Sequence, residues 1–159
     1  MNKNILYIFF LALLFSGCEK DDICLLPTTP KLILRFYDAE NRANFKNVEN
    51  ASIWAEGKDS LSTYTNVTLD SIAIPLNTNT SQTIYNLKRS TTGNTADNEY
   101  TKITINYTTE TIFVSRSCGL KSIFNSVTIA SDNGWFQSIS TNSIPTIDHE
   151  TSAHVKIYH

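Results

Sequence analysis

The stretch Leu32-Ile-Leu-Arg-Phe-Tyr37 decides the fold class of this 159-residue chain. Its apolar residues Leu32, Leu34 and Phe36 alternate with Ile33, Arg35 and Tyr37, and a period of two is that of a β-strand. One face of this strand is entirely apolar and must be covered by other elements of the domain. The stretch therefore predicts a sheet with one buried face.

Similar short alternating segments follow along the whole chain, separated by turn residues. We expect strands over residues 48–56, 61–67, 72–76, 83–87, 103–107, 112–114, 127–129, 135–139 and 155–157. No apolar pattern of helical spacing persists, and residues 120–124 have room for one helical turn at most. Short strands at regular intervals predict an all-β, antiparallel β-sandwich, with immunoglobulin-like topology as the expected strand order.

Three connections in this scheme are predicted from particular residues. Thr108-Thr109-Glu110 is expected to join the strands on either side of it in a hairpin. Asn133-Gly134 favours a second tight hairpin turn, which would return residues 127–129 into residues 135–139. Pro75 is expected at a sheet edge or at the end of a strand, because proline cannot donate a ladder hydrogen bond.

The N-terminus has the pattern of an export signal. Lys3 precedes an almost unbroken apolar run over residues 5–15, which is shorter than the roughly 20 residues of a membrane span but suits a signal peptide. Ser16-Gly17-Cys18 then resembles a bacterial lipobox, in which the cysteine is lipidated after cleavage. We expect residues 1–17 to be a removed signal peptide and Cys18 to be the lipidation site, so that the lipid holds the protein on a membrane. The alternative is a buried N-terminal strand.

Glu19-Lys20-Asp21-Asp22 follows the lipobox and indicates where the protein is sent. A lysine followed by two acidic residues resembles the tag of surface-exported lipoproteins of the Bacteroidota type. The expected location is the outer membrane, with the protein facing the cell exterior; the alternatives are the inner leaflet of that membrane and a purely solvated acidic spacer. Residues 18–30 would be the extended tether, and residues 31–159 the single β-sandwich domain.

Charge and cysteine content indicate which partners and which covalent crosslinks to expect. The chain has 13 basic and 15 acidic residues and no basic patch interleaved with aromatics, so we expect no nucleic-acid partner. Besides Cys18, the chain contains Cys24 and Cys118. An even pair in an oxidising compartment predicts a disulfide, and two unpaired buried thiols are the alternative.

Two motifs resemble a known family. The leader from Cys18 to Cys24 with Thr29-Pro30-Lys31-Leu-Ile-Leu-Arg-Phe-Tyr-Asp38 is similar to the opening of a Bacteroidota lipoprotein family of unknown function. Val114-Ser-Arg-Ser-Cys-Gly119 resembles its late motif, Val-Ser, two variable residues, then Cys-Gly. The resemblance implies a lipoprotein and supports pairing of Cys24 with Cys118; it implies no activity.

Sequence patterns of catalysis and of cofactor binding are missing. The histidines, His149, His154 and His159, have no tight metal-ligand spacing, so we expect surface histidines and no metal site. There is no Gly-x-Ser-x-Gly elbow, Gly-rich phosphate loop or calcium loop. We therefore expect a protein that is not an enzyme and has no cofactor.

Two sets of residues are candidate surface sites. Trp135 and Phe136 are adjacent after the predicted turn, so both should not face one core, and they are the candidate ligand-binding patch for a glycan; burial in the core is the alternative. Asp59-Ser60-Leu61 and Asp70-Ser71-Ile72 resemble O-glycosylation sites of exported proteins in this bacterial group, which makes Ser60 and Ser71 candidates for modification.

Two functions from different classes remain open. The first is a non-catalytic structural or interaction module of the cell envelope, which an uncapped sheet edge would favour. The second is a ligand- or glycan-binding accessory lipoprotein, which an exposed cluster containing Trp135 and Phe136 would favour. An envelope protein or a glycan is the expected partner.

Overall fold

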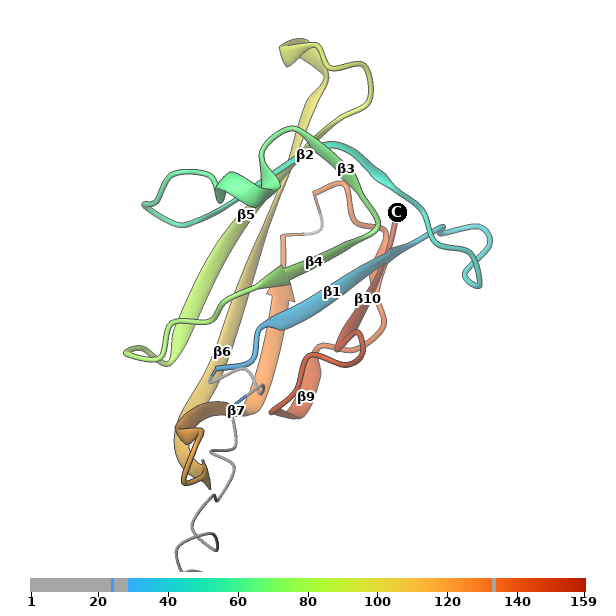
Figure 1. The fold of residues 1–159 in the computed structure, drawn as a ribbon. Helices are drawn as coiled ribbons and strands as arrows, with labels where there is room; N and C mark the ends of the chain where they lie inside the picture. Colours follow the sequence, from blue (N-terminus) through green and yellow to red (C-terminus); the bar gives the residue numbers. More distant parts are fainter. Residues whose placement is uncertain (1–23, 25–28, 133) are drawn as a thin grey trace, which may run out of the picture.

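Two packed β-sheets make up the domain in the computed structural model, which describes residue 24 and residues 29–132 and 134–159 (Figure 1). The helical elements of this described part are two 3-10 turns, Ser62–Tyr64 and Thr95–Asp97. The predicted all-β sandwich is therefore confirmed. One sheet contains β4 (Ser71–Ile74), β1 (Leu32–Tyr37), β10 (Val155–Tyr158) and β8 (Ser138–Ile139), in that spatial order. The other contains β3 (Val67–Leu69), β2 (Val48–Ala55), β5 (Gln82–Ser90), β6 (Asn98–Ser115), β7 (Gly119–Ser131) and β9 (Ser143–Ile147).

The core lies between the inner faces of these sheets. Leu32, Leu34 and Phe36 of β1 are at most 1% exposed, as their alternation requires. They join one cluster with apolar side chains of the other strands, among them Ile53, Ile72, Leu87, Ile103, Ile105, Phe124 and Ile157. Burial of this shared apolar layer is the main stabilising contribution to such a sandwich.

The strand order differs from the expected immunoglobulin-like one. In an immunoglobulin domain the first strand pairs with the second, whereas here β1 lies between β4, which is antiparallel to it, and β10, which is parallel to it. The second strand, β2, lies in the other sheet. Alternation tells which face of a strand is buried, but it does not tell which strand lies beside it, so the pattern predicted the layers and not their order.

The predicted hairpin at Thr108-Thr109-Glu110 is wrong, because β6 runs without a break from Asn98 to Ser115. These three residues pair with Asn125, Phe124 and Ile123 of β7, as the good strand propensity of threonine allows. The chain turns later, at residues 116–118, and Gly119 takes a φ of +69° there. Residues 120–124, the candidate helical turn, are part of β7.

The hairpin predicted at Asn133-Gly134 is also absent. Asn133 itself lies outside the described residues, but β8 pairs with β10 in the four-stranded sheet and not with β7. Gly134 lies so close to β6 that a Cβ there would stand 2.2 Å from the carbonyl oxygen of Tyr100. Here the glycine allows the chain to cross between the sheets.

Two smaller expectations have mixed outcomes. The candidate strand over residues 61–67 contains the 3-10 turn Ser62–Tyr64, and a strand, β3, begins only at its last residue, Val67. Pro75 follows directly after β4, the edge strand of its sheet, as predicted.

The β6–β7 hairpin projects beyond the rest of the sandwich (Figure 1). β5 pairs with β6 only up to Asn106, and β9 pairs with β7 only as far as Phe124. Residues 111–122, which we call the hairpin arm, therefore form a ladder of two strands. The arm forms the lower end of the molecule in Figure 1.

Candidate functional site

The arm carries the cysteine pair. The sulfur atoms of Cys24 and Cys118 are 1.95 Å apart and their Cα atoms 4.9 Å apart, so the structure joins the two residues predicted to pair, across 94 positions of sequence. The Ser115 hydroxyl accepts a hydrogen bond from the backbone N–H of Cys118 at 3.0 Å, which fixes the turn around the bond. Cys18, the predicted lipidation site, and most of the predicted tether lie outside the described residues.

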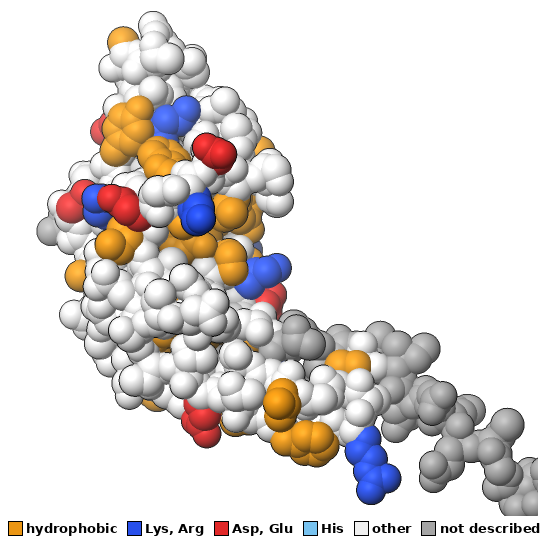
Figure 2. Space-filling model, turned by 90° about the vertical axis from the view of Figure 1, so that its left-hand side faces the viewer, with side chains coloured by type: hydrophobic (Ala, Val, Ile, Leu, Met, Phe, Trp, Pro, Cys, Tyr) orange, Lys and Arg blue, Asp and Glu red, His pale blue; other side chains and the backbone are white. Residues whose placement is uncertain are grey.

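Two large apolar side chains of the arm are exposed. Phe113 is 67% and Leu120 61% exposed, and they are direct cross-strand partners in the β6–β7 ladder. Directly opposed residues in an antiparallel pair project from the same face of the ribbon. The arm therefore presents a small apolar patch, which we call the tip patch, with Arg116 exposed in the turn beside it. Figure 2 shows hydrophobic side chains close to a basic one at this lower end of the molecule.

Trp135 and Phe136, the candidate glycan patch, are buried, and the prediction that they form an exposed cluster is wrong. They are 6% and 4% exposed, and their rings meet edge to face with centroids 4.5 Å apart. Both also pack on Phe36 of β1. Adjacent residues point to opposite sides only within a regular strand, and this segment precedes β8, so both rings can enter one core.

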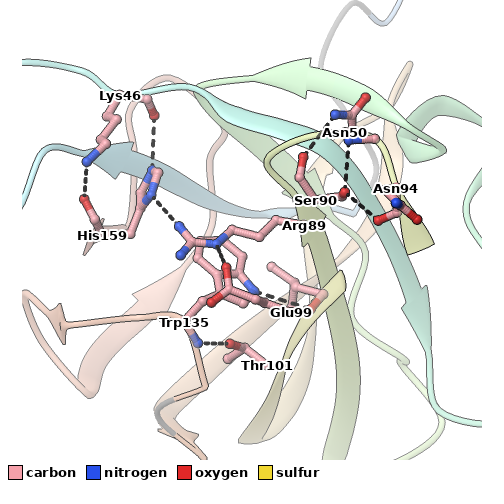
Figure 3. A network of polar contacts seen from close by, with 11 residues as sticks. Lys46, Asn50, Arg89, Ser90, Asn94, Glu99, Thr101, Trp135 and His159 are labelled. Atoms are coloured by element: carbon pink, nitrogen blue, oxygen red, sulfur yellow. Dashed lines mark hydrogen bonds and ion pairs between the residues drawn. The ribbon is translucent and has the colours of Figure 1, made fainter. Parts of the chain in front are cut away.

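Arg89 and His159 pack against Trp135 and belong to a polar network (Figure 3). The Arg89 guanidinium lies 4.8 Å above the Trp135 ring, donates to a carboxylate oxygen of Glu99 at 2.6 Å, and reaches Nδ1 of His159 at 3.2 Å. The backbone N–H of Trp135 donates to the Thr101 hydroxyl at 2.9 Å. We use the name aromatic–arginine junction for the buried rings of Phe36, Trp135 and Phe136 together with Arg89, Glu99, Thr101 and His159.

His159 is a buried member of that junction, which corrects the prediction of surface histidines. It is 6% exposed and packs edge-on against Phe36 and Trp135. Burial lowers the pKa of its imidazole, and the neighbouring Arg89 and Lys46 charges act in the same direction. The neutral ring can accept from Arg89 through Nδ1 and donate through Nε2 to the carbonyl oxygen of Lys46 at 3.4 Å.

A hollow of about 180 Å³ opens beside this junction, lined in part by Lys46, Arg89, Ser90 and His159. Lys46 lies 3.3 Å from the Asp38 carboxylate and Arg89 is paired with Glu99, and Glu49 also lines the hollow. The two cationic side chains of the hollow are thus matched by carboxylates of the domain. The arrangement suits a structural role, closing the core where the two sheets meet.

His154 has a structural role at the start of β10. Its Nδ1 accepts a hydrogen bond from the backbone N–H of Ile33 at 2.9 Å, and its ring stacks on His149 with centroids 5.4 Å apart. Burial is the main cause that lowers the pKa of His154, with the His149 charge second. Among the residues described, no three His, Cys, Asp or Glu side chains are grouped as a metal site would require.

The exposed aromatic surface lies instead on the outer face of the six-stranded sheet. Trp54 of β2 and Tyr100 of β6 meet edge to face at 6.3 Å, and Tyr100 is 55% exposed. Beside them, Glu56 accepts hydrogen bonds from Asn86 at 2.9 Å and Lys102 at 3.3 Å, which lower the pKa of its carboxyl. We call these five residues the outer-face cluster. The sequence held a signal for it, because Trp54 alternates with the buried Ile53 and so faces outward.

The two candidate modification sites differ in accessibility. Ser60 is exposed, on the segment between β2 and the first 3-10 turn. Ser71 is half-buried at the first position of β4 and paired with Arg35 in the sheet register, and the neighbouring Asp70 forms an ion pair with Arg35 at 3.2 Å. An enzyme would reach Ser60 more easily.

The four edge strands of the two sheets, β4, β8, β3 and β9, are protected. The Tyr64 hydroxyl accepts from the backbone N–H of Ala73 at 2.9 Å, on edge strand β4. Edge strand β9 contains Pro145, and the other edges, β3 and β8, have three and two residues. Short or proline-containing edges do not readily add a further strand. The uncapped edge that would favour strand addition is found, among the described strands, along the hairpin arm, where residues 111–122 are paired on one side only.

Fold and site together define a class: a two-sheet β-sandwich with an extended hairpin arm that is crosslinked to the leader of the chain. Sequence comparison then identifies the family. Residues 50–159 match a family of unknown function, DUF6452, and the chain belongs to this family. No curated protein and no solved structure matches the chain significantly. No helix of the described residues is long and apolar enough to cross a membrane.

Proposed function

We propose that this protein is a lipid-anchored protein of the bacterial outer membrane, facing the exterior, whose domain acts by contact with other envelope components and not by catalysis. The lipobox ending in Cys18 and the acidic tag at residues 19–22 support the anchor and the location. The resemblance of the leader and of residues 114–119 to a lipoprotein family of Bacteroidota supports the same assignment.

One observation carries the proposal: the bond between Cys24 and Cys118. A disulfide persists in oxidising compartments and is rare in the cytosol, so this pair supports export. Cys24 also lies only six positions after Cys18. A force on the anchor would thus reach the folded domain through a covalent crosslink, and the first strand would not have to bear it alone.

The test is metabolic labelling of the full chain in a bacterial host with an alkyne-bearing fatty acid. We expect the label on the wild-type protein and none on C18S, whereas C118S, the matched control, keeps it. Protease added to intact cells should cleave the domain if it faces outward. Label on C18S, or no label on the wild type, would contradict the anchor; an uncut domain beside a cleaved surface protein would contradict the orientation.

Glycan binding is the second candidate function, and the outer-face cluster favours it. Exposed aromatic rings beside amide and carboxylate groups can stack on a sugar ring and hydrogen-bond its hydroxyls. A glycan array should then show binding that Tyr100→Ala abolishes and that Phe45→Ala, a change at another exposed aromatic residue, leaves intact. Equal binding by both variants would remove this candidate.

A further inference from the structure

The tip patch needs an explanation, because a two-stranded ribbon has no core of its own and apolar side chains there have nothing to cover them. Phe113 and Leu120 are among the largest exposed apolar side chains of the described residues, and they face one another across the ladder. Scattered single apolar residues on a surface are ordinary. A directly opposed pair at the end of a projecting arm is different, since both side chains can enter the same surface together.

The patch is close in the chain to a cysteine that connects it to the proposed lipid anchor. Leu120 is two residues from Cys118, and Cys118 is bonded to Cys24. The six positions from Cys18 to Cys24 span about 20 Å even when fully extended. A lipid on Cys18 therefore keeps Cys24 within about 20 Å of the membrane surface. The turn of the arm is close to Cys24, because the Cα atom of Cys118 lies 4.9 Å from that of Cys24.

We propose that the tip patch is a second membrane contact, in which Phe113 and Leu120 enter the interfacial layer of the bilayer that holds the lipid anchor. This inference rests on the proposed lipid anchor. Aromatic and aliphatic side chains favour this boundary, and one weak contact becomes effective when an anchor already holds the protein at the surface. The contact would fix the orientation of the sandwich relative to the membrane.

The charged groups around the patch are of both signs. Arg116 is exposed in the turn, and Lys121 of β7 donates from its Nζ to the carbonyl oxygen of Asp148 at 2.8 Å. Glu110 of β6 accepts from the Asn125 amide at 2.7 Å. With mixed charges, apolar burial has to drive the contact, and the bilayer's own charge should have a small effect.

The experiment uses vesicles of phosphatidylethanolamine and phosphatidylglycerol with brominated acyl chains, which quench tryptophan only at short range. The mature chain carries a lipid on Cys18, either the native one or a synthetic diacyl lipid coupled to that thiol, so that the protein is held at the vesicle surface as the proposal requires. We expect the tryptophan of the Phe113→Trp variant to be quenched on vesicle addition. Tyr100→Trp, in the same strand but on the outer-face cluster, is the matched control, and its added tryptophan should not be quenched.

A loss-of-contact variant completes the test. Replacing both Phe113 and Leu120 by serine in a mature chain with Cys18→Ala, which carries no lipid, should lower vesicle partitioning about tenfold, while Tyr100→Ser in the same chain leaves it unchanged. No quenching in the Phe113→Trp variant, together with equal partitioning of the serine variants, would overturn the inference. So would a dimer in sedimentation that the double variant abolishes, because a second copy would then cover the patch.

The inference and the proposed function can fail separately. A labelled Cys18 together with no quenching in the Phe113→Trp variant would leave the anchor intact and remove the second contact. Quenching in that variant, in a protein whose Cys18 is never lipidated, would support membrane contact by the arm and overturn the anchor.

Discussion

The aromatic–arginine junction and the hairpin arm both carry large apolar side chains, but the junction buries them and the arm leaves them exposed. At the junction, Phe36, Trp135 and Phe136 pack on one another, and Arg89 and His159 pack against Trp135. At the arm, Phe113 and Leu120 face solvent on a ribbon held by a disulfide. The junction gains its order from the burial of apolar area, whereas the arm keeps its shape through backbone pairing and a covalent bond.

This difference separates residues that stabilise the fold from residues that are free to contact something outside the domain. Residues that many neighbours enclose have a folding role, and their loss should destabilise the domain. Residues left exposed on the crosslinked arm have little to contribute to folding, and the membrane contact proposed above would give them a role outside the domain. Four changes test this division, in order of decreasing expected effect.

The largest effect is expected from the same substitution made in the two regions. Phe36→Ala removes a ring that is 1% exposed and packed on three aromatic neighbours, so it should lower the free energy of unfolding by about 3–5 kcal/mol. Phe113→Ala should change it by no more than about 0.5 kcal/mol. Urea unfolding of both variants measures this, and equal losses would contradict the division.

Removing the disulfide should have the next largest effect. Cys118→Ser opens a loop of 94 positions, and closing loops of this size stabilises proteins by about 2–4 kcal/mol by restricting the unfolded chain. The unfolding midpoint should therefore fall in C118S and in the wild type under reducing conditions. Ser117→Ala, a change in the exposed turn, serves as the control. A midpoint insensitive to reductant would show that the bond does not stabilise the fold.

A smaller effect is expected from Arg89. Arg89→Met removes the cation above Trp135 and the ion pair with Glu99, which together should contribute about 1 kcal/mol. Lys102→Met is the matched control, because its ion pair with Glu56 is about half exposed on both sides and should contribute about 0.5 kcal/mol or less. Equal losses in the free energy of unfolding would mean that Arg89 stabilises the fold no more than the exposed Lys102 does.

The smallest effect is a pH dependence from His159. Its pKa is lower in the folded protein than in the unfolded chain, because burial disfavours the charged imidazole. The unfolded chain then binds more protons as the pH falls through about 6.5, so the free energy of unfolding should be highest above that pH and decline below it.

Unfolding measured at pH 7.5 and pH 5 tests this dependence. His159→Gln should make the decline smaller, and His149→Gln, a change at an exposed ring, should leave it as in the wild type. A decline that is identical in all three proteins would assign the dependence to other groups.

Local pattern predicted the layers of the fold well. The alternation in Leu32–Tyr37 identified a buried strand face, and the alternation around Ile53 and Ile103 identified the opposing sheet. Local pattern did not identify the hairpin turns correctly. Thr108-Thr109-Glu110 resembles a connection by polarity, yet it continues β6, because threonine and glutamate are accommodated on the outer face of a ribbon.

Prediction of the site was weaker for a related reason. Neighbours in sequence were expected to separate across a strand, but Trp135 and Phe136 lie outside any strand and enter the core together. The outer-face cluster joins residues from three strands, Trp54, Asn86 and Tyr100 among them. Their proximity depends on register, which the local sequence does not specify.

The sequence by itself determined the all-β class, the buried faces of the strands and the two cysteines that could pair, because each follows from local chemistry or from residue count. Only the tertiary structure decided the strand order, the length of the arm, the burial of Trp135 and Phe136, and the exposure of Phe113 and Leu120. Those features depend on contacts between distant segments, and such contacts are chosen by the packing of the whole chain at once.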